Sequence, residues 1–98
     1  MGEESLDKES PKLVKIVLDV LKTHTPSLIE FSNVISRVRG VSKVEAILVE
    51  VDAETDSIKL VIEGDGIDYE ELEKTIKRLG ATIHSIDEVV VQRIKENQ

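Results

Sequence analysis

The sequence contains no cysteine and almost no aromatic residues. Without cysteine there is no disulfide, no thiolate metal site and no cysteine nucleophile. The aromatic residues are Phe31 and Tyr69, which make up 2% of the chain, so the hydrophobic core has to be built from valine, isoleucine and leucine. So few aromatic side chains also leave no platform on which the bases of a nucleic acid could stack.

Long hydrophobic runs and clustered positive charges are missing as well. No apolar run approaches the ~20 residues that a membrane-spanning helix needs, and the first residues are acidic where a signal peptide would be basic. The net charge is −7, whereas affinity for nucleic acids comes from lysines and arginines that neutralise phosphates. We therefore expect a cytoplasmic protein that binds neither membranes nor nucleic acid.

The residues that are present suit one small domain. The chain has 98 residues, of which 40% are hydrophobic and 34% are charged, and this is a typical domain size. Residues 1–11 are polar and end at Pro11, so they predict a flexible lead-in. Residues 12–98 then form the domain, with a C-terminal extension from about residue 88.

The spacing of apolar residues predicts six elements. Period-two alternation indicates strands at about residues 13–22, 44–52, 57–63 and 81–86, with a continuation of the last one through 89–91 left open. Helical spacing indicates helices at about 28–38 and 68–79. Ser27 with Glu30, and Asp68 with Glu71, are the residue pairs that begin helices, and glycines follow both helices, as is usual at their C-terminal ends.

The order of these elements defines the fold class. Strand, helix, strand, strand, helix, strand is the βαββαβ order of a ferredoxin-like α+β sandwich. Connections between strands of one sheet that pass through a helix are right-handed, which places both helices on the same face. The expected architecture is a four-stranded antiparallel sheet with two helices on one face and nothing on the other.

The uncovered face of this sheet is predicted to be apolar. Such a face usually marks an interface, and edge strands readily pair with another chain. We therefore expect a homo-oligomer, although scattered exposed aliphatic residues are also common on any protein surface. The candidate interface residues are Val17, Leu21, Leu48, Val61, Val89 and Val91.

Acidic residues on or beside the strands suggest a divalent cation. Oxygen-rich clusters suit Ca²⁺ or Mg²⁺, and His84 on the last strand could lie near Asp19 on the first. Carboxylates on a solvated face are the alternative. The candidate metal ligands are Asp19, Glu50, Asp52, Glu63, His84 and Asp87, and the loop acids Asp65, Asp68 and Glu71 form a second set.

The sequence offers no catalytic motif. We find no serine in a nucleophile elbow, no P-loop and no complete dinucleotide-binding glycine motif. We therefore expect that the protein is not an enzyme and that it holds no cofactor other than calcium or magnesium.

Several segments resemble a small archaeal family of unknown function, number 211 in the domain-of-unknown-function series. These segments are Leu18–Lys22 with His24 and Pro26-Ser27, Val49–Asp52 with Glu54-Thr55, Ile62–Asp65, and Leu79-Gly80 with Ile83–Val90. The resemblance covers residues 12–91. It implies a stand-alone ferredoxin-like domain that forms homo-oligomers and has no assigned activity. The positions that it singles out are Asp19, His24, Glu50, Asp52, His84, Asp87 and Glu88.

Two functional hypotheses follow. In the first, the protein is a non-catalytic homo-oligomer that holds Ca²⁺ or Mg²⁺ at subunit contacts. In the second, it resembles the ACT group of amino-acid-sensing domains, which bind ligand at a subunit interface beside the loop after the first strand. That loop contains the candidate ligand-binding residues His24, Thr25 and Ser27, but it has Pro26 where ACT domains usually have a glycine-containing turn.

Overall fold

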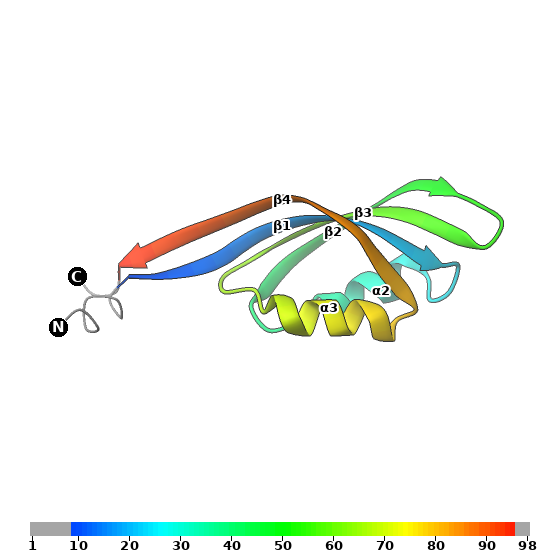
Figure 1. Ribbon diagram of the computed structural model, residues 1–98. Helices are drawn as coiled ribbons and strands as arrows, with labels where there is room; N and C mark the ends of the chain where they lie inside the picture. The colour runs from blue at the N-terminus through cyan, green and yellow to red at the C-terminus, as the bar shows by residue number, and fades with distance from the viewer. Residues whose placement is uncertain (1–8, 96–98) are drawn as a thin grey trace.

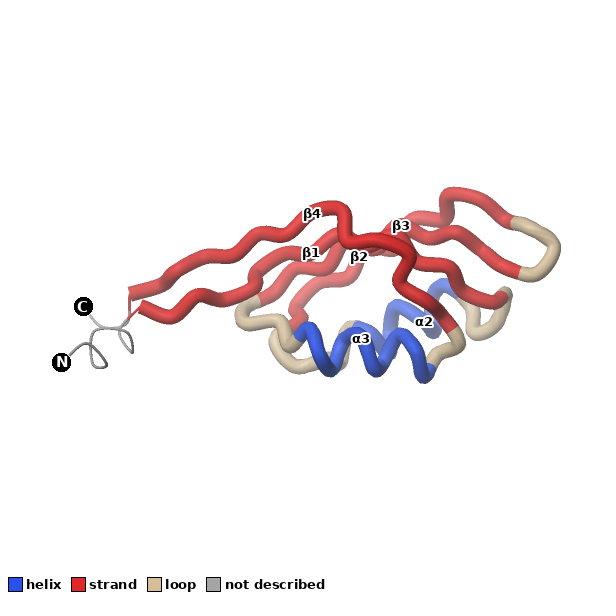
Figure 2. Tube along the Cα trace, in the orientation of Figure 1, coloured by secondary structure: helices blue, strands red, loops and turns tan. Residues whose placement is uncertain are grey.

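The computed structural model describes residues 9–95 and contains the predicted fold. Its elements are β1 (Glu9–Thr23), α2 (Leu28–Ile35), β2 (Val41–Val51), β3 (Thr55–Gly64), α3 (Tyr69–Arg78) and β4 (Ala81–Lys95). The strands form one antiparallel sheet in the order β2-β3-β1-β4. Both helices cover the same face (Figures 1 and 2). The ferredoxin-like α+β class is thereby confirmed.

The core lies between the sheet and the two helices. It is aliphatic except for Phe31, as the composition required, and its central side chains are fully or almost fully buried. They are Ile16, Leu18 and Val20 on β1, Ile58, Leu60 and Ile62 on β3, Phe31 and Ile35 on α2, and Leu72 and Ile76 on α3. Every second residue of the two central strands therefore faces the helices.

Both helices begin where the sequence indicated. The Ser27 hydroxyl accepts a hydrogen bond from the Glu30 backbone amide, and the Glu30 carboxylate accepts one from the Ser27 amide. At the start of α3, the Asp68 carboxylate accepts from the Glu71 amide. The predicted end of the first helix was wrong, because α2 stops at Ile35. Val38 is nevertheless buried in the core, since the turn that follows α2 keeps it on the same side.

The first and last strands of the chain are longer than predicted. β1 begins at Glu9, so residues 9–11 of the expected lead-in belong to a strand, and residues 1–8 lie outside the described part. β4 is continuous to Lys95, so the expected C-terminal extension is strand. β3 pairs with β1 only from Lys15 onward. Residues 9–14 and 90–95 therefore form a two-stranded ribbon, here called the arm, which projects from the rest of the sheet (Figure 1).

At the opposite end of the molecule, β2 and β3 form a hairpin whose loop spans residues 52–54 (Figure 2). The Asp52 amide donates to the Thr55 carbonyl at 2.8 Å and closes the turn. We call residues 48–58 the hairpin end. The arm and the hairpin end lie at opposite extremes of a molecule that is 57 Å long and only 21 by 18 Å across.

Two glycines allow the backbone to cross itself beside the sheet. Gly40 has a φ of +88°, and its carbonyl accepts from the Asp65 amide at 2.8 Å. A Cβ atom on Gly64 would lie 1.9 Å from the Gly40 carbonyl oxygen, and a Cβ atom on Gly40 would lie 2.1 Å from the Gly66 oxygen. Only glycine fits at these two positions, and the crossing fixes the entry into β2 against the exit from β3.

Candidate functional site

A buried lysine lies at the end of β1. Lys22 continues the inward-facing series of Ile16, Leu18 and Val20, and its side chain is 1% exposed. Its Nζ donates to the carbonyls of Thr23 at 2.9 Å, His24 at 3.4 Å and Pro26. A buried ammonium is tolerated only where such partners replace water. Sequence reasoning missed this residue, although the period-two pattern already placed it on the core face.

Lys22 also has an acidic partner from the hairpin. Its Nζ lies 3.8 Å from the Asp56 carboxylate, which is itself mostly buried, and 5.7 Å from the centre of the Phe31 ring. The lysine therefore joins the loop after β1, the hairpin and the first helix, and it fixes the shape of the loop in which the ligand-binding residues were predicted.

His24 connects the same loop to the hairpin turn. Its Nδ1 lies 2.9 Å from Asp56 Oδ1, and its Nε2 lies 2.9 Å from the Ala53 carbonyl oxygen. Both partners are acceptors, so both hydrogen bonds form only when the imidazole carries two protons. The bond to Ala53 and then the bond to Asp56 raise the pKa of His24 above 6.5, while desolvation and Lys22 oppose the rise.

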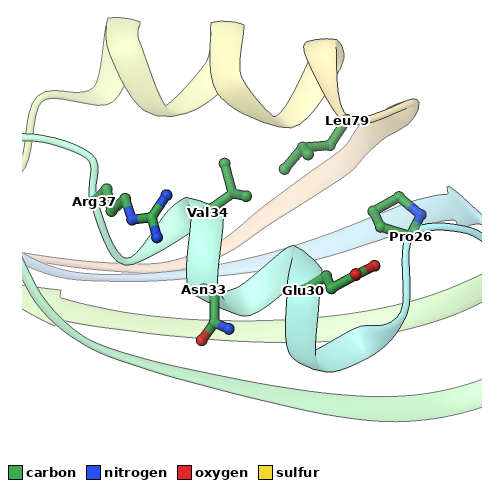
Figure 3. A pocket seen from close by; sticks show the side chains of 6 residues that line it. All are labelled: Pro26, Glu30, Asn33, Val34, Arg37 and Leu79. Atoms are coloured by element: carbon green, nitrogen blue, oxygen red, sulfur yellow. The ribbon is translucent and has the colours of Figure 1, made fainter.

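The other polar residues of this loop serve its own structure. The Thr25 carbonyl accepts from the Thr23 hydroxyl at 2.8 Å, and the Ser27 hydroxyl caps α2. A hollow of about 370 Å³ lies beside the loop, between α2 and the end of α3 (Figure 3). Val34 and Leu79 point into it, and Glu30 and Arg37 lie toward its two ends. It is lined by Pro26, Glu30, Asn33, Val34, Arg37 and Leu79, which do not include His24, Thr25 or Ser27.

The candidate metal ligands are distributed over the whole sheet. Asp19 and Glu63 project from the helix-free face, where each lies opposite a lysine on the neighbouring strand. Glu50 and Asp52 lie at the hairpin end, and Asp87 on β4 accepts from the Ser85 hydroxyl at 2.8 Å. Within residues 9–95, no three histidine or acidic side chains come together in the manner of a metal site.

His84 and the loop acids also lie apart from these residues. His84 occupies an irregularity of β4 beside the pair formed by Asp19 and Ser85, and in the described part of the chain no hydrogen bond or ion pair joins it to Asp19. Asp68 caps α3. The Glu71 carboxylate accepts from the Arg39 amide at 3.3 Å. Asp68 and Glu71 are thus engaged in beginning α3 and in holding it against the turn that follows α2.

The helix-free face is less open than the sequence suggested. Val17 points to this face but is only 4% exposed, because it lies between Val61 on β3 and Glu88 on β4, and Lys15 forms an ion pair with Glu88 at 3.5 Å. The expectation that Val17 is an exposed residue was wrong. Val61 is half-buried and Leu21 is 38% exposed.

The exposed aliphatic residues gather on the two edge strands instead. Ten large hydrophobic side chains are exposed among the described residues, and eight of them belong to β2 or β4. These eight are Ile47, Leu48, Val49 and Val51 on β2 and Ile86, Val89, Val90 and Val91 on β4. Each edge strand also has a row of backbone groups that no neighbouring strand in the sheet pairs. The predicted interface residues Leu48, Val89 and Val91 are all in this set.

Comparison with known proteins identifies the family. Residues 14–97 match the model of the family DUF211, which is described as uncharacterised ArCR. An uncharacterised protein of Methanocaldococcus jannaschii, MJ0319, is 41% identical over 76 residues, which are 78% of each chain. The protein belongs to the DUF211 family, as the resemblance predicted. Among the residues that the structure describes, no helix has the length and apolar character needed to cross a membrane.

Proposed function

We propose that this protein is a non-catalytic, cytoplasmic, self-assembling protein whose subunits associate through the edges of their sheets. The supporting observation is that eight of the ten exposed large aliphatic side chains lie on β2 and β4. Proteins that remain monomeric usually protect their sheet edges with charges, prolines or covering loops. Here the middle of each edge is aliphatic, and neither edge strand contains proline.

The free energy for association comes from burying these side chains. Complete burial of a valine, leucine or isoleucine contributes about 1.5–3 kcal/mol, and the eight side chains are between 37% and 63% exposed. A strand added at either edge would also satisfy backbone groups along its whole length, as in other complexes in which a strand joins an existing sheet. Both contributions act at the same edge strands.

The experiment is a measurement of molar mass by size-exclusion chromatography with light scattering. Wild-type protein is expected to elute at a multiple of 10.9 kDa at micromolar concentration. Val49→Lys, on the β2 edge, is expected to reduce that mass. The matched control is Ile29→Lys, because Ile29 is 74% exposed on α2 and lies away from both edges. A wild-type protein that is monomeric throughout the micromolar range would refute the proposal.

The proposal includes a Ca²⁺ or Mg²⁺ ion held between subunits. Glu50 and Asp52 are exposed at the hairpin end, and carboxylate oxygens are the ligands that these ions prefer. Thermal melting of the assembled protein is expected to shift downward after treatment with EDTA and to recover on addition of Ca²⁺ or Mg²⁺. Identical melting curves under all three conditions would remove the cation from the proposal.

The hollow beside the first loop supports a second candidate, an ACT-like sensing function. Pro26 from that loop lines the hollow, and Glu30 and Arg37 offer opposite charges toward its two ends, which suits a zwitterionic ligand such as an amino acid. A thermal-shift screen against amino acids and nucleotides tests this function. A stabilising compound whose effect is lost in Arg37→Ala would support sensing, and a screen without stabilisers would exclude it.

A further inference from the structure

The hollow between α2 and α3 carries opposite charges toward its two ends. Glu30 lies toward one end and Arg37 toward the other (Figure 3). Val34 and Leu79 point into the space between the helices. Arg37 follows Glu30 by seven positions, and the turn after α2 keeps it close to the helix, since its amide donates to the Val34 carbonyl at 3.1 Å. At a rise of about 1.5 Å per residue, this spacing corresponds to roughly 10 Å along the helix.

The walls of the hollow are held in place by contacts with the rest of the protein. Phe31 and Ile35 are fully buried and fix α2 on the core. The Pro26 carbonyl accepts a hydrogen bond from the buried ammonium of Lys22. Leu79, directly after α3, packs against the core. A ligand would therefore meet walls that are already ordered, which lowers the entropy that binding costs.

The charged groups at the two ends are available to a ligand. Glu30 Oε1 accepts from the Ser27 amide at 3.4 Å, and its Oε2 accepts from none of the described residues. The Arg37 guanidinium forms neither a hydrogen bond nor an ion pair within residues 9–95. A carboxylate that receives an ammonium group and a guanidinium that receives a carboxylate form charge-assisted hydrogen bonds, which are stronger than neutral ones.

The separation of these charges decides which zwitterion fits. In an α-amino acid the ammonium and carboxylate groups are attached to the same carbon atom, so the molecule reaches only one end of the hollow. A linear zwitterion whose charges are separated by an aliphatic chain or by the backbone of a short peptide reaches both ends. Val34 and Leu79 would contact the apolar middle of such a ligand. The volume of about 370 Å³ is within the range of roughly 300–1,000 Å³ that is typical of small-molecule sites.

We propose that the hollow binds a linear zwitterion, with its ammonium group at Glu30, its carboxylate at Arg37 and an aliphatic middle between them. This inference rests on the second candidate function above, in which the hollow holds a zwitterionic ligand, and it names the ligand class. ω-Amino acids and short peptides belong to that class, whereas α-amino acids do not. The site is separate from the proposed self-assembly, because none of its lining residues belongs to β2 or β4.

Leucine and 6-aminohexanoate test the charge separation, because they are isomers with the same two charged groups. In isothermal titration calorimetry with the full chain, 6-aminohexanoate is expected to bind at least about tenfold more tightly than leucine. Hexylamine and hexanoate carry one charge each and are expected to bind about tenfold more weakly than 6-aminohexanoate. Alanyl-leucine separates the two sources of the ligand. Tighter binding than 6-aminohexanoate assigns the hollow to peptides, and weaker binding assigns it to ω-amino acids.

Two substitutions locate the bound charges. Glu30→Gln keeps an acceptor for the Ser27 amide, and it is expected to weaken the binding of 6-aminohexanoate about tenfold while leaving that of hexanoate unchanged. Arg37→Gln is expected to weaken 6-aminohexanoate to a similar extent and to leave hexylamine unchanged. Glu70→Gln and Lys77→Gln are the matched controls, because both residues are exposed on α3 and do not line the hollow.

The contrary outcomes are distinguishable. If leucine binds as tightly as 6-aminohexanoate, the hollow holds an α-amino acid, so the sensing candidate stands and the linear zwitterion is wrong. If 6-aminohexanoate binds equally well to wild type, Glu30→Gln and Arg37→Gln, its site lies elsewhere and the inference is also wrong. If none of the compounds binds, the second candidate function fails together with this inference. The molar mass of the protein judges self-assembly independently of all three results.

Discussion

At the scale of single residues, Lys22 shows most clearly how position decides the role of a side chain. Its place in the alternating pattern of β1 puts an ammonium in the core. There, three carbonyls accept hydrogen bonds from it and Asp56 forms an ion pair with it. Lys22→Met would leave those carbonyls without their donor and Asp56 without its buried partner. We expect a loss of about 2–4 kcal/mol in the free energy of unfolding.

Denaturant unfolding followed by circular dichroism measures this loss. Lys59→Met is the matched control, because Lys59 is exposed on the other face of β3 and its replacement should change stability by less than about 0.5 kcal/mol. Equal effects of the two substitutions would mean that the contacts of Lys22 contribute nothing to stability.

His24 gives the fold a pH dependence of known sign. Its folded-state pKa lies above the ordinary value of 6.5, so its two hydrogen bonds stabilise the protein fully below about pH 6.5. That contribution is lost as the pH rises through the raised pKa. We expect His24→Gln to lower stability at pH 5.5 and to have little effect at pH 8.5, as measured by urea unfolding at concentrations too low for assembly. Parallel pH profiles for the two proteins would contradict this assignment.

Gly64 and Gly66 differ in what surrounds them, although they are two residues apart. A Cβ atom at Gly64 would lie 1.9 Å from the Gly40 carbonyl oxygen, whereas at Gly66 the nearest atom is Cδ of Lys12 at 3.9 Å. Gly64→Ala should therefore cost about 1–3 kcal/mol or more by forcing backbone apart. Gly66→Ala should cost about 1 kcal/mol, which reflects its φ of +71° alone. Thermal unfolding of both variants makes the comparison, and a larger loss for Gly66→Ala would show that backbone strain outweighs the clash.

At the scale of elements, the sequence predicted the fold and most strand faces because both depend on local periodicity. The predicted end of α2 was wrong because the apolar residue Val38 keeps the helical spacing although the helix has already ended. The length of the arm was missed because its pairing joins residues that are about 80 positions apart, and no local pattern marks where such a ladder stops. The expectation that Val17 is exposed was wrong, because the burial of this side chain depends on neighbouring residues of β3 and β4.

The candidate site was predictable only in part, for the same reason. The sequence indicated that the loop containing His24 and the acidic strand ends were worth attention. It could not show that Asp56 approaches both Lys22 and His24, because that meeting depends on the register of β1 against β3. Likewise, the hollow lined by Val34 and Leu79 exists only because α2 and α3 lie side by side.

The arm is the element whose stability should depend most on assembly. Residues 9–14 and 90–95 have one neighbouring strand each, so their amides should exchange quickly with solvent in dilute, dissociated protein. Once a third strand joins the arm, the amides that it pairs should become protected. Hydrogen exchange with mass spectrometry over a range of protein concentrations measures this change. Peptides from residues 58–62 of β3 are the internal control, and arm peptides that are equally protected at every concentration would show that the arm is stable alone.

At the scale of the whole molecule, net charge should oppose assembly. The net charge of −7 makes any two copies repel each other, and salt weakens that repulsion, since the screening length falls from about 10 Å at 0.1 M salt to about 3 Å at 1 M. Higher salt should therefore strengthen the association that we propose.

Added negative charge away from the sheet edges tests this repulsion. Lys74→Glu with Lys77→Glu reverses two exposed lysines on α3, and changes the net charge from −7 by four units, to −11. The double variant is expected to have a higher dissociation constant than wild type at 0.05 M NaCl, and the difference should shrink at 0.5 M NaCl. Sedimentation equilibrium at both salt concentrations measures the two constants, and a difference that is the same at both would show that the substitutions act through something other than long-range repulsion.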